Sequence, residues 1–327
     1  MKYVFKTFDE LTPDDIRQYL DLYNTTFERN LSEGEFRYKF TQQMGPNSYF
    51  VFIMDDKAGI VGSLGAIEVV YTFRGERLKF GLEVDAMIDP AYRRDVLAMR
   101  RQHDVLFKEL NRRGFGWVFT KPNNNSYLYL KTLLGFSDIG QLWAYAFPIR
   151  PFRALHPWLS FLDPLWLVPV TIASWIANPA QNFKDVSLNE LEPESADDEA
   201  ACIHRARDAE FLRNRYGTER YHAAALNDRF VIFNTTAYGR RSACFALEAK
   251  KMRFRDWLAF IRYTAARHPD VDVILRITGR AKSCLPLFRI PRRLLPNKFR
   301  IVGKPIGDRV LPANVEFRMD LSDFEVV

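Results

Sequence analysis

The stretch that decides the fold is residues 81–114, which read GLEVDAMIDPAYRRDVLAMRRQHDVLFKELNRRG. Over residues 82–89 apolar side chains alternate with mostly acidic ones, and this pattern predicts a strand with one apolar and one acidic face. Pro90 has no amide hydrogen for a strand ladder, so the strand ends before it. From Val96 onward apolar side chains recur every three or four residues, which predicts a helix that ends at Gly114.

The start of this predicted helix is a candidate anion site. The first amides of a helix have no partner within the helix and can donate to an anion. Arg93 and Arg94 add positive charge beside them. The alternative interpretation is that both arginines belong to a solvated helix start.

The composition is that of a globular protein. The 327 residues are 47% hydrophobic and 27% charged, which is enough apolar surface for two ordinary cores. The formal net charge of +7 favours acidic partners such as coenzyme A, phosphorylated sugars, anionic lipid or an acidic carrier protein. The sequence lacks a helix-turn-helix, zinc or RNA-binding signature, which argues against nucleic acid as a partner.

Several common chemistries are excluded by missing motifs. The chain lacks the Gly-x-Ser-x-Gly elbow of serine hydrolases, a Walker loop and a Cys-x-x-Cys pair. The five histidines show no metal-ligand spacing, and His103 lies on the apolar stripe of its helix, so we expect a core residue there and no metal. Three widely spaced cysteines, Cys202, Cys244 and Cys284, together with a start that has no apolar signal core, indicate the cytoplasm.

Periodicity predicts further elements around the central stretch. They are helices over residues 12–27, 33–43 and 125–134, and strands over residues 49–54, 60–71, 116–120 and 141–148.

The central stretch resembles the acyl-CoA-binding core of the GNAT superfamily of N-acyltransferases, which also has a strand, a Pro-x-Tyr-Arg turn and a long helix. The order of the predicted elements over residues 1–150 is similar to the GNAT order. In that family an Arg/Gln-x-x-Gly-x-Gly/Ala turn wraps the CoA pyrophosphate. The matching residues are Arg93, Arg94, Asp95, Val96, Leu97 and Ala98. Arg93 and Ala98 fit the pattern, whereas Val96 replaces the central glycine and Asp95 brings a negative charge.

The resemblance extends to a second motif in which an asparagine precedes a helix with a tyrosine and then Gly-Phe. By this likeness Asn125 bonds the pantetheine arm, and Tyr127 or Tyr129 protonates the departing thiolate. The amides near Met87 and Ile88 would also bond the pantetheine and polarise the thioester carbonyl. The alternative for Asn125 and the tyrosines is helix capping and core packing.

Glu83 and Asp85 are the candidate general bases. Both lie on the acidic face of the predicted strand, and two neighbouring carboxylates can raise the pKa of one of them. Either carboxylate could then remove the proton from an acceptor ammonium. The alternative is that both are solvated or paired.

Residues 154–177, ALHPWLSFLDPLWLVPVTIASWIA, form the most apolar run in the chain. His156, Asp163 and three prolines interrupt it, and prolines leave helix backbone groups unpaired. We therefore expect a connector buried between two domains. The alternative is a segment at a membrane surface, which its tryptophans would suit.

The second half repeats the first in outline, with strands over residues 230–233 and 243–250, a helix over 256–267 and a strand over 271–277. It lacks a Pro-x-x-Arg turn, since Lys250 runs straight into the helix. We therefore predict an α/β (α+β) fold of two GNAT-like domains, each a mixed, mainly antiparallel sheet flanked by helices. The expected bounds are residues 1–150 for the acyl-CoA-binding domain, 151–182 for the connector and 183–327 for a second domain without a CoA loop.

The resemblance implies an N-acyltransferase that takes acetyl-CoA or another acyl-CoA as co-substrate. The acceptor would be a small amine of the amino-sugar or amino-acid type. Two alternatives stay open: a non-catalytic tandem-GNAT protein that binds a ligand or partner, and a transferase like the Fem-type enzymes that uses a charged tRNA. The expected location is the cytoplasm, with contact to an acidic carrier protein or to the inner membrane surface as a further option.

Overall fold

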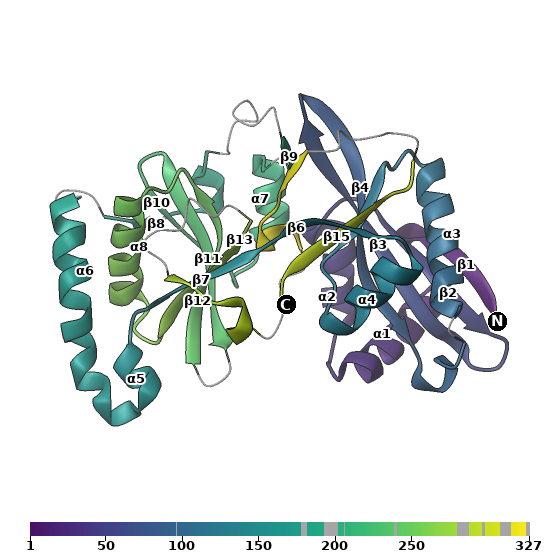
Figure 1. The fold of residues 1–327 in the computed structure, drawn as a ribbon, viewed down its shortest axis with the longest axis horizontal. Helices are drawn as coiled ribbons and strands as arrows, with labels where there is room; N and C mark the ends of the chain where they lie inside the picture. The colour runs from purple at the N-terminus through teal and green to yellow at the C-terminus, as the bar shows by residue number, and fades with distance from the viewer. Residues whose placement is uncertain are drawn as a thin grey trace. The chain divides into compact units, whose positions relative to one another are not determined.

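The computed structural model describes residues 1–95, 97–177, 182–192, 202–205, 207–238, 241–279, 288–295, 298–307 and 315–324. The chain forms two compact units (Figure 1). Unit 1 comprises Met1–Gly140, Ala196–Ala206 and Phe299–Phe317. Unit 2 comprises Gln141–Ser195, Arg207–Lys298 and Arg318–Val327.

Unit 1 is built on one mainly antiparallel sheet. Its main strand order is β1-β2-β3-β4-β5-β15-β6, and β9 pairs with both β3 and β16. The strands are β1 (Lys2–Thr7), β2 (Ser48–Asp55), β3 (Gly59–Phe73), β4 (Glu76–Ile88), β5 (Trp117–Thr120), β6 (Ser137–Gln141), β9 (Cys202–Arg205), β15 (Arg300–Pro305) and β16 (Glu316–Arg318). The β4–β5 pair is parallel, and β1 is an addition to the predicted elements.

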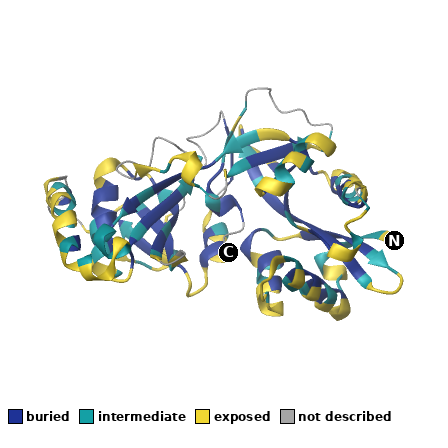
Figure 2. Cartoon of the chain, turned by 60° about the horizontal axis from the view of Figure 1, so that its bottom comes forward, coloured by how far each residue is buried: buried dark blue, intermediate teal, exposed yellow. Residues whose placement is uncertain are grey.

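Helices cover both faces of this sheet because neighbouring residues of its strands point to opposite sides. On one face, the aromatic rings of α1 (Pro13–Phe27), α2 (Glu33–Tyr38) and the π-helical turn η2 (Lys39–Gln43) pack on Phe50. On the other face, α3 (Ala98–Arg112) and α4 (Asn124–Leu133) pack on Val51. Figure 2 shows the sheets of both units as mostly buried.

Unit 2 repeats this plan. Its sheet runs β14-β7-β13-β12-β11-β10-β8, and β12 and β13 are parallel. The strands are β7 (Trp143–Pro148), β8 (Lys184–Asp185), β10 (His222–Leu226), β11 (Arg229–Tyr238), β12 (Arg241–Lys250), β13 (Val273–Thr278) and β14 (Phe288–Arg289). Helix α8 (Phe254–Arg267) packs on one face and α7 (Ala209–Tyr216) on the other.

Each sheet takes a strand from the other half of the sequence. Strand β15 lies between β5 and β6 in the first sheet, and β7 pairs with β13 in the second. The units therefore differ from the predicted division into a first domain over residues 1–150, a connector over 151–182 and a second domain over 183–327. Residues 141–150 belong to unit 2, so the predicted strand over 141–148 does not close the first sheet; β6 lies at that end.

The prediction that residues 154–177 are buried is wrong. This run forms α5 (Pro151–Leu155), the 3₁₀ helix η4 (Pro157–Leu162) and α6 (Asp163–Ala177). Only the face of α6 that packs toward α8 is covered, and most of its large apolar side chains are exposed (Figure 2). Hydrophobicity alone gave the wrong result because it does not say which face of a helix finds a partner.

The predicted fold class is confirmed, since both units are mixed, mainly antiparallel sheets flanked by helices. Cys202 and Cys244 are buried, whereas Cys284 lies outside the described residues.

Candidate active site

The candidate site lies where β4 separates from β5. The two strands pair in parallel only over three positions, the last of which joins Leu82 to Phe119. Strand β4 continues for six residues beyond that pair, to Ile88. The Thr120 hydroxyl, at the end of β5, donates to the Glu83 carbonyl at 3.0 Å. In the described part of the chain, the edge of β4 that faces β5 thus has no ladder partner from Val84 onward, which leaves backbone groups there for a ligand.

A bulge in β4 begins beside this point. Gly65 pairs with Val84 and Ser63 with Met87, so β4 has two residues where β3 has one. Asp85 takes up the extra length with a left-handed backbone, φ 51°. A side chain at Gly65 would lie about 3.1 Å from the Val84 side chain, which explains the glycine.

The Asp85 side chain is held from the α1–α2 face of unit 1. Its carboxylate accepts from Lys39 Nζ at 2.6 Å and from Tyr19 Oη at 2.5 Å. Asp85 and Lys39 are both buried, with side-chain exposures of 7% and 4%. Such a pair fixes the bulge, because moving either residue would leave the other as an uncompensated charge.

Glu83 lies apart from Asp85 and contacts α3. Its Oε2 lies 3.3 Å from Nε2 of His103, and both side chains are buried. His103 Nδ1 lies 2.7 Å from the Met99 carbonyl, which can only accept, so Nδ1 carries a hydrogen and Nε2 faces Glu83. Burial is the largest single influence and lowers the pKa of His103, but Glu83, the Met99 carbonyl and Asp104 together outweigh burial, so the net pKa is raised. The charged form of the His103 ring is therefore favoured beside the Glu83 carboxylate.

Tyr129 comes from α4 and lies within the electrostatic reach of Glu83. Burial, and then the Glu83 carboxylate, raise the pKa of Tyr129 to about 12. Its hydroxyl is buried and makes no hydrogen bond within the described residues. The other candidate, Tyr127, instead donates to Asp138 at 3.0 Å. The structure thus brings Glu83, His103 and Tyr129 together and sends Tyr127 elsewhere.

In the turn that was expected to hold the CoA pyrophosphate, some of the backbone amides already donate to Asp95. The Asp95 carboxylate accepts from the Leu97 amide at 3.0 Å and pairs with Arg101 at 3.0 Å. The Asp95 carbonyl accepts from the Ala98 amide at 3.0 Å. Two of the amides at the start of α3 are therefore already bonded, and a carboxylate lies beside them.

The other predicted binding residues surround this turn. Arg93 donates from Nε to the Ile88 carbonyl at 2.8 Å, and Arg94 is exposed. Met87 and Ile88 are buried at the end of β4. Val96 lies outside the described residues.

The residue that caps α4 is not Asn125, for which capping was the alternative role. Asn123 caps the helix, because its side chain accepts from the amides of Asn125 and Ser126 at 3.0 and 2.8 Å. Asn125 itself is exposed in the first turn.

Two partners of the site were not identified from the sequence. His103 was assigned to the core, although a histidine on an apolar stripe beside an acidic strand is also the pattern of a buried ion pair. Lys39 carried no local signal, since its contact with Asp85 joins residues 46 positions apart.

A cavity of about 380 Å³ lies at the opposite end of β4, around Arg77, Lys79 and Trp117. None of the candidate site residues lines it.

Comparison with known proteins agrees with this geometry. Residues 7–134 match the family model described as an acetyltransferase (GNAT) domain. No curated protein matches the sequence.

Solved structures resemble nearly the whole chain. A GCN5-related N-acetyltransferase from Anabaena variabilis has 14% identity and a TM-score of 0.59, covering 93% of this chain and 73% of that one. A probable N-acyltransferase from Enterococcus faecalis has 12% identity and a TM-score of 0.59, covering 94% and 73%. Eis1 from Mycobacterium abscessus has 9% identity and a TM-score of 0.52, covering 94% and 74%. At these identities the likeness establishes the fold.

Proposed function

We propose, from the premise that residues 7–134 form a GNAT domain, that this protein is an acyl-CoA-dependent N-acyltransferase with its site at the end of β4. The observation that carries the proposal is the buried Glu83–His103 pair on the strand that separates from β5, with Tyr129 beside it. Transfer to an amine needs a group that removes a proton and a group that returns one. Glu83 and Tyr129 are suited to these two roles.

Glu83 acts as the general base in this proposal. It takes a proton from the acceptor ammonium, and the freed amine nitrogen attacks the thioester carbonyl. The carbon–nitrogen bond forms as the carbon–sulfur bond breaks, and the nitrogen then releases its second proton, which balances the proton that Tyr129 gives to the thiolate. His103 is a positioning residue, because its Nε2 fixes the Glu83 carboxylate and its charge governs when that carboxylate can accept a proton.

Tyr129 returns a proton to the thiolate that leaves. Its raised pKa of about 12 keeps the hydroxyl protonated at neutral pH, and its hydroxyl has no competing bond within the described residues. Asp85 is assigned to position the β4 bulge and not to proton transfer, since Lys39 and Tyr19 hold its carboxylate.

Acyl-CoA, as co-substrate, supplies the acyl thioester. The unpaired edge of β4 near Met87 and Ile88 would bond its pantetheine arm, and Arg93 and Arg94 would face its phosphates. The residues fit the thioester end of this ligand well. At the phosphate end Asp95 must give up its bond to the Leu97 amide or move aside.

The test is an assay of acetyl transfer from acetyl-CoA to a panel of amino sugars and amino acids. The release of the CoA thiol is the measured signal. We expect turnover with at least one amine, and a loss of about a hundredfold or more in Glu83→Gln with little change in CoA affinity. Asp138→Asn is the matched control, because Asp138 pairs with Lys131 on the same unit and not with Glu83. An unchanged rate in Glu83→Gln would reject Glu83 as the base.

One observation favours a second candidate function. Asp95 occupies the turn that an active GNAT enzyme would offer to phosphate, as expected of a non-catalytic protein with a degenerate CoA site. That candidate predicts no turnover with any amine or acyl-CoA, together with binding of another ligand.

A further inference from the structure

The outer face of α6 is more apolar than its inner face. The side chains turned inward include Asp163 and Ser174, which are buried, and Leu167 and Val170, which pack against the unit 2 core. The exposed side chains of the same helix are large and apolar: Leu165, Trp166, Val168, Ile172, Trp175 and Ile176. A surface helix in water has the reverse arrangement, with its polar side outward.

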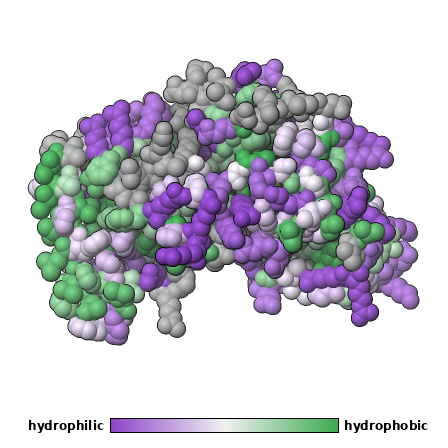
Figure 3. All heavy atoms as spheres, in the orientation of Figure 1, coloured by the Kyte–Doolittle hydropathy of each residue, from purple (hydrophilic) through white to green (hydrophobic). Residues whose placement is uncertain are grey.

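The preceding turns continue this surface. Leu155, Trp158 and Phe161 are exposed by 65% or more. We call residues 151–176 the apolar segment. Between Arg153 and Lys184 the only charged residue is Asp163, and it is buried. Figure 3 shows hydrophobic side chains gathered along the edge of the molecule where α6 lies. An uncharged exposed surface of this extent marks an interaction site.

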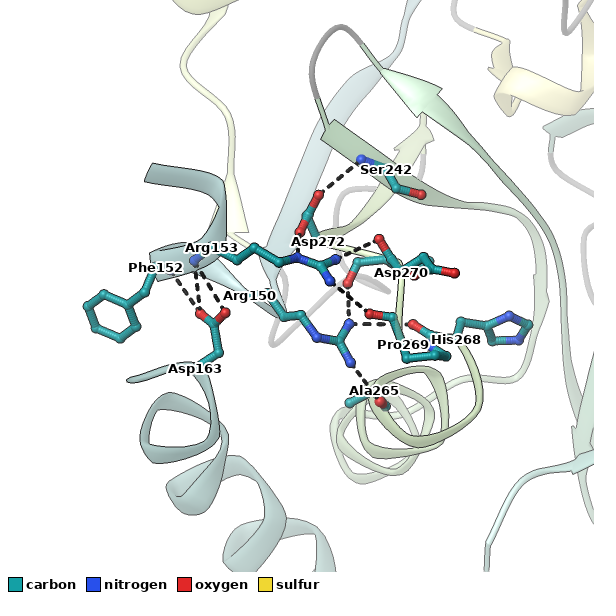
Figure 4. Close-up of polar contacts among 11 residues, drawn as sticks. Arg150, Phe152, Arg153, Asp163, Ser242, Ala265, His268, Pro269, Asp270 and Asp272 are labelled. Atoms are coloured by element: carbon teal, nitrogen blue, oxygen red, sulfur yellow. Dashed lines mark hydrogen bonds and ion pairs between the residues drawn. The ribbon is translucent and has the colours of Figure 1, made fainter. Parts of the chain in front are cut away.

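The start of the apolar segment is anchored to unit 2 by polar contacts (Figure 4). The Asp163 carboxylate accepts from the amides of Phe152 and Arg153 at 2.9 and 3.2 Å. Arg153 pairs with Asp272 at 2.7 Å and donates to the Asp270 carbonyl at 2.7 Å. These bonds fix the start of the segment. The exposed apolar side chains are therefore a feature of the folded protein.

Two further contacts hold the base of the segment. Arg150 donates to the Ala265 carbonyl, at the end of α8, at 3.0 Å. The Trp166 ring nitrogen donates to the Pro148 carbonyl at 2.8 Å. The indole is therefore held at the base of the segment, with the Trp166 residue 37% exposed.

Charge identifies the partner of this surface. Unit 2 holds 24 of the 47 Lys and Arg residues and 16 of the 40 Asp and Glu residues, a formal net charge of +8, which leaves −1 for unit 1. Exposed Arg241 lines the same small cavity as Leu155, at the base of the segment. A positive body with an apolar, tryptophan-rich surface complements an anionic lipid membrane. A second copy would instead bring two positive units together.

We propose that the apolar segment docks this protein on an anionic membrane surface, with α6 lying in the interface. Three of the six tryptophans, Trp158, Trp166 and Trp175, lie on the segment, and tryptophan suits the headgroup level of a bilayer. Residues 157–176 are long and apolar enough to cross a membrane by composition. However, α6 has 15 residues, about 22 Å of helix against about 30 Å of hydrocarbon, and its inner face is bound to unit 2. The segment therefore lies on the membrane and does not span it.

The test is flotation of the full chain with vesicles of phosphatidylcholine alone and of phosphatidylcholine mixed with phosphatidylglycerol. We expect binding to the mixed vesicles that is about tenfold stronger than binding to the neutral ones and that weakens with salt. Fluorescence of the exposed tryptophans should shift to the blue on binding.

The variant Leu165→Ser/Ile172→Ser/Ile176→Ser should lose at least tenfold of this binding, because three exposed apolar side chains no longer enter the interface. The matched control is Leu128→Ser in unit 1, since Leu128 is 65% exposed and Leu165 67%. The changed positions face solvent, so circular dichroism should show the native fold. Binding and acetyl transfer are separate readouts, and an inactive chain that still floats would reject the enzyme assignment alone.

Three outcomes would overturn the proposal. They are the absence of vesicle binding, equal binding to neutral and anionic vesicles, and equal binding by the triple variant and the native chain. Self-association that the triple variant abolishes, without vesicle binding, would assign the surface to a second copy.

Discussion

Glu83 and His103 face each other from a strand and a helix, and each determines what the other can do. Because His103 Nδ1 is bonded to the Met99 carbonyl, a proton gained by the ring is placed on Nε2, against Glu83. A carboxylate beside an imidazolium is a weak base, and one beside a neutral ring is a stronger base. The protonation state of His103 therefore connects the stability of unit 1 with its proposed chemistry.

Stability should depend on pH through His103. The folded pKa is raised above the ordinary value near 6.5, so the pair contributes fully below pH 6.5 and its contribution is lost as pH rises through the folded pKa. We expect His103→Gln to lower the free energy of unfolding more at pH 6 than at pH 9, as measured by denaturant titration. The exposed His156→Gln is the control. An equal loss at both pH values would contradict the ion pair.

Asp85 should behave as a structural residue. Asp85→Ala leaves Lys39 buried without its carboxylate, and we expect a loss of about 3–5 kcal/mol in the free energy of unfolding. Replacing both residues, as Asp85→Asn with Lys39→Met, should recover much of that loss and retain turnover. If the stable double variant were inactive, Asp85 would have a part in catalysis.

At the scale of elements, the proposed site is formed by the strand β4, its bulge and the start of α3. The bulge turns successive β4 side chains toward different partners, with Glu83 toward α3 and Asp85 toward Lys39. A regular strand would place these two residues on one face, as the sequence pattern predicted. The turn after Pro90 then leads to α3, where Asp95 fills part of the anion position.

Asp95 should limit the affinity for acyl-CoA. Asp95→Asn removes a negative charge beside the expected phosphate position, and we expect several-fold tighter binding of acetyl-CoA, about 1 kcal/mol. Arg93→Ala with Arg94→Ala should act in the opposite sense, weakening binding about tenfold, about 1.4 kcal/mol. Equilibrium fluorescence titration measures both changes. Weaker binding by Asp95→Asn would mean that Asp95 shapes the turn for the ligand.

Much of the fold was predictable because local patterns specify local elements. Helix α1, which Thr12 caps, lies within the predicted range 12–27, and β2, β3 and α3 follow their periodicity closely. Of the residues in the proposed site, Glu83 and Tyr129 were candidates from the sequence, and their roles stay predictions. His103 and Lys39 were not candidates, since their partners lie far away in the sequence. The bulge at Asp85 could not be predicted, because aspartate carries no strong signal for a left-handed backbone.

At the scale of the whole molecule, the exchange of β7 and β15 is the main feature that local patterns could not reveal. The six-residue strand RIVGKP has three consecutive buried residues, and nothing in its sequence indicates which sheet it joins. Its buried residues Ile301 and Val302 fill the gap between β5 and β6. Each half of the sequence thus completes the sheet of the other.

The two halves should therefore not fold separately. A chain cut to residues 1–140 lacks β15, which exposes the edge of β5 and the apolar surface that Ile301 and Val302 cover. We expect this chain to show weak near-ultraviolet circular dichroism and no cooperative melting. Joining residues 299–317 to it through a flexible linker should restore both. Cooperative folding of residues 1–140 alone would contradict the exchange.

The whole molecule should hold one acyl-CoA. Unit 2 has the same strand plan, but Asp256 is buried at the start of α8, accepts from the Arg253 amide at 2.8 Å and pairs with Arg229 at 2.5 Å. The start of α8 therefore already has a carboxylate partner within the chain and is not expected to bind the phosphates of a second acyl-CoA.

Isothermal titration of the full chain with acetyl-CoA tests the account most directly. We predict a stoichiometry of one per chain and about tenfold weaker binding in the Arg93→Ala/Arg94→Ala variant. No heat with any acyl-CoA would contradict the acyltransferase site, and two equivalents per chain would contradict its restriction to unit 1.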